Sequence, residues 1–134
     1  MKLQVNIDVD DLEQGIAFYQ SALGFTLRRR LFDGTVAEMT GGSSSVYLLT
    51  RPVGSSASPN VSAPRDYRRH WTPVHLVVEV EDIEGAVHRA LSCSAKLEGE
   101  IQTFKWGRIA MMSDPFGHGF CLLQFIGRGY DEVA

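Results

Sequence analysis

Residues 4–13, Gln-Val-Asn-Ile-Asp-Val-Asp-Asp-Leu-Glu, and residues 75–84, His-Leu-Val-Val-Glu-Val-Glu-Asp-Ile-Glu, decide the fold, because they are two copies of one pattern. The copies align at a constant offset of 71 residues (75 − 4 = 71). In each copy every second side chain is apolar, and an aspartate then precedes a helical pattern, which predicts a strand followed by a capped helix. A repeat of this kind predicts two copies of one structural module.

Each predicted helix is followed by three short runs of alternating apolar and polar residues, which are typical of strands. The runs cover residues 26–32, 35–40 and 45–50 in the first copy, and residues 97–103, 108–113 and 119–125 in the second. Glycine-containing turns separate most of them. The sequence therefore predicts an α+β fold of two tandem βαβββ modules.

The 134-residue chain has the length of one domain. We expect a single domain with a first module over about residues 1–52, a connector over about 53–73, a second module over about 74–127 and a tail over 128–134. The connector is rich in Gly, Ser and Pro and is too long for a simple turn. Two interpretations stay open for it, a lid over a cavity or a linker without a chemical role.

The composition argues against several classes of protein. A net charge of −3 lacks the positive field that nucleic-acid binding needs, and no apolar stretch is long enough to span a membrane. No signal-peptide pattern follows Met1, so we expect the cytoplasm as the location. The two cysteines are too few for a disulfide framework. The run Arg28, Arg29 and Arg30 is expected on a solvated strand face.

Motifs spread over nearly the whole chain resemble the glyoxalase/bleomycin-resistance/extradiol-dioxygenase (vicinal oxygen chelate) superfamily. These motifs are Asp11-Leu12-Glu13, Phe18-Tyr19, Leu23-Gly24-Phe25 and Asp114-Pro115-Phe116-Gly117-His118. The resemblance implies mixed sheets that curl into an open half-barrel with the helices on the outer face. It also implies a cavity for a small organic molecule and a homodimer that shapes this cavity.

The resemblance further implies four positions for metal ligands, which fall on Gln4, Tyr47, His75 and Cys121. Gln4 and His75 fit the family pattern at the strand starts, whereas Tyr47 and Cys121 replace the usual Glu or His on the last strands. A divalent metal needs about three protein ligands, with carboxylate or imidazole dominating for hard or borderline ions. One hypothesis is therefore that no metal binds. The other is that Gln4, His75 and Cys121 hold Zn, Ni, Fe or Mn.

Asp8 and Glu79 are candidates for proton transfer, because they occupy equivalent positions in the two predicted first strands. They share a strand face with Gln4 and His75. Two close carboxylates raise the pKa of one of them, which would give a general acid or base. The alternative is that each carboxylate pairs with an arginine, such as one of residues 28–30, or with solvent.

Five residues are candidates for lining the ligand pocket: Tyr47, Glu38, Arg108, Trp106 and Met111. Glu38 and Arg108 lie in strand runs with apolar neighbours, and a buried charge there would be a polar anchor for a ligand. The other three would supply apolar walls, or would simply belong to the core. His70, His88 and His118 receive no role from the sequence alone.

Two functions remain open at this point. The first is a metal-independent binding protein that holds a small amphipathic molecule between apolar walls. The second is a metal-dependent lyase, isomerase or dioxygenase of the glyoxalase type, in which Glu79 or Asp8 moves protons. The sequence has no Gly-rich phosphate loop, no Gly-x-Ser-x-Gly elbow and no Cys-x-x-Cys pair, which argues against nucleotide hydrolysis, triad hydrolysis and thiol redox chemistry.

Overall fold

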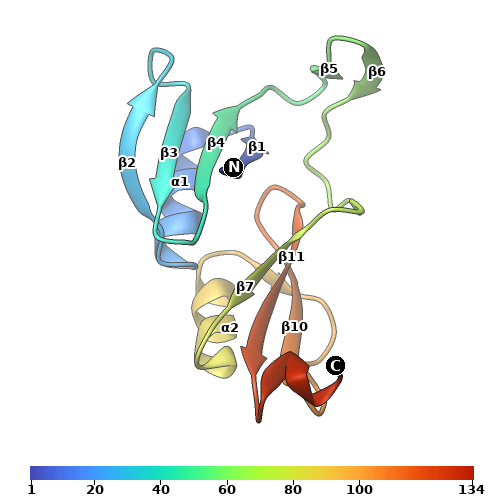
Figure 1. The fold of residues 1–134 in the computed structure, drawn as a ribbon. Coiled ribbons are helices and arrows are strands. Elements are labelled where there is room, and N and C mark those ends of the chain that lie inside the picture. The colour runs from blue at the N-terminus through green and yellow to red at the C-terminus, as the bar shows by residue number, and fades with distance from the viewer. The chain divides into compact units, whose positions relative to one another are not determined.

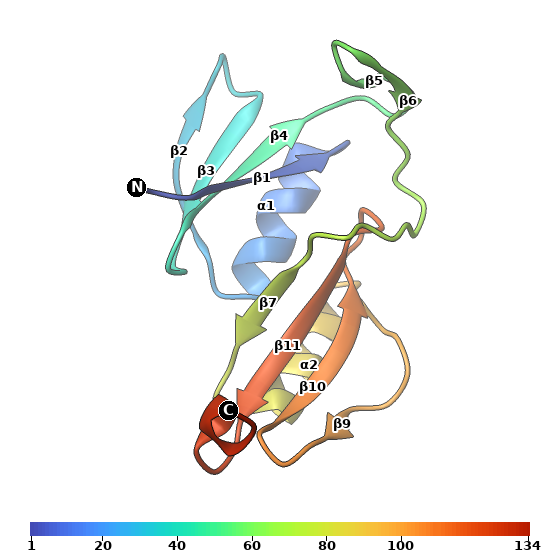
Figure 2. The same cartoon turned by 45° about the vertical axis from the view of Figure 1, so that its right-hand side comes forward.

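A computed structural model describes all 134 residues and divides them into two compact units, Met1–Arg68 and Arg69–Ala134. In each unit one helix lies against one face of an open, mixed sheet (Figure 1 and Figure 2). The predicted α+β class and the repeated order of strand, helix and strands are thereby confirmed. The expectation of a single domain concerns how the units sit together and stays a prediction. No helix has both the length and the apolar character that crossing a membrane requires.

Unit 1 contains the first predicted module. Its elements are β1 (Gln4–Val9), α1 (Leu12–Ser21), β2 (Thr26–Leu31), β3 (Val36–Thr40) and β4 (Ser45–Thr50). The strand order is β1-β4-β3-β2, with β1 parallel to β4 and the other pairs antiparallel. The helix begins after Asp11, whose carboxylate accepts the Gln14 amide at 3.0 Å, as the sequence predicts. Gly24, at φ +74°, reverses the chain after the helix.

Unit 2 repeats this arrangement with one departure. Its elements are β7 (Leu76–Glu79), α2 (Ile83–Ser92), β8 (Lys96–Leu97), β9 (Gln102–Thr103), β10 (Gly107–Ser113), β11 (Gly119–Phe125) and the 3-10 helix η1 (Gly129–Glu132). The strand order is β7-β11-β10-β8, and β9 also pairs with β10. The predicted continuous strand over residues 97–103 is wrong, because the chain leaves the extended conformation at Gly99, where φ is +89°.

The connector contains a hairpin that the sequence analysis did not predict, formed by β5 (Ser56–Ser58) and β6 (Val61–Pro64). Its side chains are exposed. The Arg65 guanidinium fastens the end of the hairpin to unit 1, since it donates to the Ala57 carbonyl at 3.1 Å and to the Asp8 carboxylate at 2.8 Å. Residues 53–68 thus belong to unit 1, and residues 69–73 belong to unit 2.

Candidate functional site

Each sheet has an open face, defined as the face opposite its helix. Side chains that are paired across neighbouring strands point to the same face. In unit 1 the register places Asn6, Tyr47, Glu38 and Arg29 in one row across the open face. In unit 2 the equivalent row is Val77, Cys121 and Met111.

The row in unit 1 is built around a buried carboxylate. Glu38 is only 2% exposed, accepts a hydrogen bond from the Tyr47 hydroxyl at 3.2 Å and forms an ion pair with Arg29. The bulge at Arg28 lets this second arginine approach the same carboxylate at 3.4 Å. The hydrogen bond from Arg29 lowers the pKa of Glu38 despite the desolvation of the carboxylate. Glu38 is therefore an ionised group whose oxygens are already engaged.

The remaining candidates in unit 1 lie on β1. Asp8 is half-buried and forms an ion pair with Arg65 at 2.8 Å, so it has an arginine partner, although not one of residues 28–30. Gln4 is exposed at the start of β1 and is paired in register with Ser45. Arg30 pairs with Glu13 of α1 at 2.7 Å.

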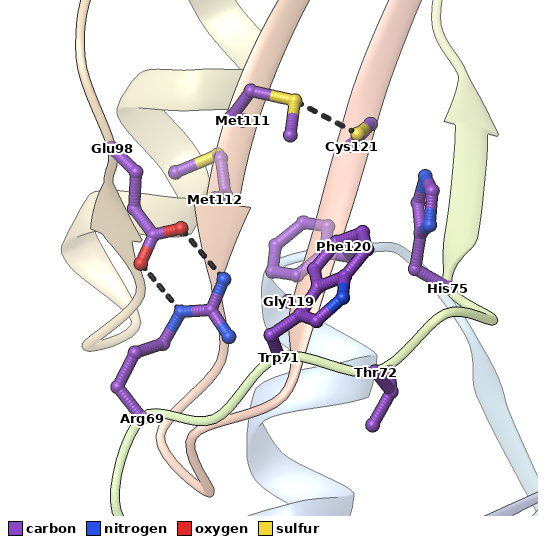
Figure 3. Close-up of a pocket in the computed structure, with 10 residues that line it drawn as sticks. All are labelled: Arg69, Trp71, Thr72, His75, Glu98, Met111, Met112, Gly119, Phe120 and Cys121. Atoms are coloured by element: carbon purple, nitrogen blue, oxygen red, sulfur yellow. Dashed lines mark hydrogen bonds and ion pairs between the residues drawn. The ribbon is translucent and has the colours of Figure 1, made fainter.

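A pocket with an empty volume of about 280 Å³ lies on the open face of unit 2 (Figure 3). It contains three of the predicted site residues, His75, Met111 and Cys121. The other lining residues are Arg69, Trp71, Thr72, Glu98, Met112, Gly119 and Phe120. The pocket joins the segment that leads into β7 with the central strands β10 and β11.

Sulfur and aromatic groups form the apolar part of this pocket. The Cys121 thiol donates to the Met111 thioether at 3.3 Å, and burial raises the pKa of this thiol (Figure 3). Cys121 is therefore a neutral thiol at physiological pH. The Trp71 indole, which is 69% exposed, lies with its ring centroid 6.1 Å from that of His75.

An ion pair forms the polar end of the pocket. The Arg69 guanidinium donates to both carboxylate oxygens of Glu98, at 2.6 and 2.9 Å (Figure 3). This hydrogen bonding lowers the pKa of Glu98 and raises that of Arg69. The guanidinium lies directly over Gly119, where a Cβ atom would come within 2.8 Å of an Arg69 nitrogen. Glycine at this position therefore makes room for the ion pair.

Three of the predicted residues in unit 2 lie outside the pocket. Arg108 lies on the helix side of its sheet and pairs with Glu84 of α2 at 2.8 Å. It is three residues from Met111, an odd spacing that puts the two side chains on opposite faces of β10. Trp106 stacks on Phe104 with ring centroids 5.4 Å apart, outside the pocket. Glu79 is exposed at the end of β7.

The metal-ligand positions implied by the resemblance do not fit a divalent ion within either unit. In unit 1 Tyr47 is a neutral phenol, and its neighbouring carboxylate, Glu38, is engaged by two arginines. In unit 2 Cys121 and His75 are only two ligand positions, and a divalent ion would need a third. No group of three or more His, Cys, Asp and Glu side chains is arranged to hold a metal ion.

Sequence reasoning missed most of the polar and aromatic lining. Arg69 and Trp71 lie in the connector, which the sequence analysis considered only as a lid or a linker. The signal was present, because a tryptophan between Arg69-His70 and Thr72-Pro73 is unusual in a segment that is otherwise rich in Gly, Ser and Pro. Glu98 gave no signal, because it follows the short strand β8 and its partner is 29 residues away.

Comparisons with known proteins agree with this fold. The sequence profile of the glyoxalase-like domain family matches residues 4–123. A glyoxalase family protein from Bacillus cereus shares 23% identity with a TM-score of 0.71 over 95% of each chain. The antibiotic-binding protein TnmS3 from Streptomyces shares 23% identity with a TM-score of 0.67, over 94% of this chain and 96% of that one.

The fosfomycin resistance protein FosX from Listeria monocytogenes is similar at 15% identity and a TM-score of 0.69, over 92% of each chain. At these identities the likeness to solved structures is one of fold. No curated protein matches the sequence.

Proposed function

The chain belongs to the family of glyoxalase-like domains, within the glyoxalase/bleomycin-resistance/dioxygenase (vicinal oxygen chelate) superfamily, and from this premise we propose that it binds a small, flat, largely apolar organic molecule without a divalent metal. The observation that carries the proposal is the pocket of unit 2, where a neutral thiol and a thioether lie close to an exposed tryptophan. The ligand class we propose includes antibiotics, since an antibiotic-binding protein shares the fold.

The lining chemistry supports a flat, aromatic ligand. The Met111 thioether makes favourable contacts with aromatic rings, and the Trp71 indole offers a large stacking surface. The empty volume of about 280 Å³ includes space that is open to solvent. The ligand is therefore small, or inserts only part of itself. Its polar substituent would lie beside the pair of Arg69 and Glu98.

The alternative, a metal-dependent lyase, isomerase or dioxygenase, is favoured by His75, which lines the pocket. Against it stands the carboxylate of Glu38, which is engaged by arginines, and no group of three or more His, Cys, Asp and Glu side chains is arranged to hold a metal ion. Metal analysis of protein purified without a polyhistidine tag decides between the two functions. About one equivalent of Zn, Ni, Fe or Mn, lost in His75→Ala, would replace the proposal with this alternative.

A dye titration tests the proposed site. We expect protein treated with a chelator to bind the aromatic probe 1-anilinonaphthalene-8-sulfonate, and Trp71→Ala to weaken this binding by about 10- to 100-fold. Trp106→Ala is the matched control, because it removes the other tryptophan, which lies outside the pocket. Circular dichroism verifies that both variants fold. Equal losses of affinity in the two variants would contradict the proposed location.

We also propose that the protein forms a homodimer. The strands β1 and β7 are each the edge of their own sheet, and exposed apolar side chains lie on or beside them: Leu3, Val74 and Val77. Unprotected edges with apolar side chains favour pairing with another chain. Light scattering across a range of protein concentrations measures the oligomeric state, and a monomer at every concentration would refute the dimer.

A further inference from the structure

The polar end of the pocket in unit 2 is formed by Arg69 and Glu98, which both line it. A guanidinium carries five N–H donors and no acceptor, whereas an ionised carboxylate carries only acceptors, about four lone-pair positions on two oxygens. Groups that already have a protein partner are not available to a ligand. The substituent that fits this end of the pocket is therefore set by the groups that remain.

Four of the five N–H groups of Arg69 have acceptors within the protein. Nε and Nη2 donate to the two carboxylate oxygens of Glu98, at 2.6 and 2.9 Å (Figure 3). Nη1 donates to the carbonyls of His70 and Gly117, the latter at 3.3 Å. The second N–H of Nη2 therefore remains as a donor that a ligand in the pocket can use.

The Glu98 carboxylate supplies a matching acceptor. Hydrogen bonds from Arg69 and, to a smaller extent, from the Ser113 side chain lower its pKa, so Glu98 is ionised at neutral pH and only accepts. Arg69 and Ser113 occupy three of its roughly four acceptor positions, which leaves about one for a ligand. The two available groups lie side by side, because Nη2 of Arg69 is 2.9 Å from Oε1 of Glu98.

The charge at this end of the pocket disfavours an anionic ligand. The hydrogen bonds with Glu98 and, to a smaller extent, the charge of Asp114 raise the pKa of Arg69, so the guanidinium already faces two carboxylates. A ligand carboxylate would accept from Nη2, but its negative charge would lie against Glu98 and it would offer no donor. A carboxamide group carries a carbonyl acceptor and an N–H donor together and has no charge.

Gly119 on β11 allows the guanidinium to occupy this position. A Cβ atom there would come within 2.8 Å of Nη2 and within 3.3 Å of Nη1 of Arg69. A side chain at residue 119 would therefore move the guanidinium and change its alignment with Glu98. Gly119 is a positioning residue for the pair.

We propose that the polar end of the pocket recognises a neutral carboxamide-like group, whose carbonyl accepts from Nη2 of Arg69 and whose N–H donates to Glu98, and that it discriminates against carboxylates. The inference rests on the proposed function, because it specifies the polar substituent of the flat, apolar ligand. The ligand class is thereby narrowed to aromatic amides, lactams and imides.

Three probes that share one aromatic ring test this preference: 2-naphthamide, methyl 2-naphthoate and the 2-naphthoate anion. Each competes with 1-anilinonaphthalene-8-sulfonate for chelator-treated protein at about pH 8, at the upper end of the range in which histidine ordinarily titrates. The affinities are compared as ratios, because the contribution of the shared ring cancels. We expect the amide to bind at least about tenfold more tightly than the ester and the anion, since it alone makes both hydrogen bonds.

Two variants should change these ratios. Glu98→Gln removes the negative charge and leaves Arg69 unneutralised, so the anion should bind about tenfold more tightly than it does to the wild type. Gly119→Ala should bring the ratio of amide to ester affinity close to one. Glu84→Gln is the matched control, because it breaks the ion pair with Arg108 outside the pocket, and it should keep the wild-type ratios. Circular dichroism verifies that each variant folds.

The possible failures are distinguishable. Equal affinities of the three probes for the wild type, or ratios that neither Glu98→Gln nor Gly119→Ala changes, would overturn the preference for an amide and leave the apolar pocket in place. Failure of the dye and of all three probes to bind would refute the proposed function, and the inference with it.

Discussion

The two units share one architecture but differ in the chemistry of their open faces. On the helix side, Leu48 of β4 and Leu122 of β11 occupy equivalent positions, and both are completely buried. On the open side, Tyr47 is equivalent to Cys121, and Glu38 is equivalent to Met111. Unit 1 thus presents a phenol and a carboxylate held by arginines, where unit 2 presents a thiol and a thioether.

This difference shows which positions maintain the fold and which are free to specialise. A strand needs apolar side chains on the face that its helix covers, because that face is removed from water. The strand register must keep these side chains there, since a slip by one residue would expose them. The other face carries no such requirement. Unit 1 has used it for an ionic network that is already satisfied, whereas unit 2 has kept an apolar pocket, which is the better site for an apolar ligand.

Core substitutions should have the largest effect and should be similar in the two units. We expect Leu48→Ala and Leu122→Ala each to lower the free energy of unfolding by about 2–5 kcal/mol, because each leaves a cavity under a helix. Urea denaturation measures this loss. Tyr47→Phe and Cys121→Ala are the open-face controls and should cost clearly less. An open-face substitution as costly as its core neighbour would break the comparison.

Exchanging equivalent open-face residues between the units should weaken ligand binding when the change is made in unit 2, but not when it is made in unit 1. Met111→Glu gives unit 2 the residue that unit 1 has at this position, and the arginine of the pocket, Arg69, is already paired with Glu98. We expect the affinity for 1-anilinonaphthalene-8-sulfonate to fall by about 10- to 100-fold, because the dye would meet an unpaired charge. The reciprocal variant, Glu38→Met, should leave dye affinity unchanged. An equal loss in both would place the ligand elsewhere.

The two engaged carboxylates, Glu38 and Glu98, should contribute to different extents to the loss of stability in acid. Glu38 and Glu98 both have a pKa below the ordinary 4.5, so each stabilises the fold above that pH and loses this contribution as the pH falls through its lowered pKa. We expect Glu38→Gln to flatten the acid-unfolding profile more than Glu98→Gln. The reason is burial, since the Glu38 side chain is 3% exposed and that of Glu98 is 35% exposed. The reverse order would contradict this account of unit 1.

The smallest effect concerns thiol reactivity. Cys121 is buried, which raises its pKa, whereas Cys93 at the end of α2 is half-buried and more accessible to reagents. At about pH 8 we expect a chromogenic disulfide reagent to label Cys93 at least about tenfold faster. The variants Cys93→Ser and Cys121→Ser identify which thiol has reacted. Faster labelling of Cys121 would contradict a neutral, covered thiol in the pocket.

The sequence was sufficient for the fold because each strand and helix carries its own local signal. The alternation in residues 4–9 and the cap at Asp11 specify β1 and α1 without any distant contact. The site was harder to predict. The sequence predicts Arg108 as a pocket residue, but its side chain lies on the face of β10 opposite that of Met111.

Long-range partners explain the other omissions. The contact of Arg69 with Glu98 joins residues 29 positions apart, and that of His70 with His118 joins residues 48 positions apart. No local sequence pattern indicates either partner. One of the alternatives for Asp8 was an arginine partner, such as one of residues 28–30, and its partner is Arg65, which the unpredicted hairpin brings to β1.

The most direct test of the account is the position of a bound ligand, read from amide chemical shifts. We predict that 1-anilinonaphthalene-8-sulfonate, added to ¹⁵N-labelled protein, shifts the amide signals of Trp71, Met111 and Cys121, and that excess chelator leaves these shifts unchanged. Shifts centred on Tyr47 and Glu38, or binding that disappears with the chelator and returns with zinc, would contradict a metal-free pocket in the second unit.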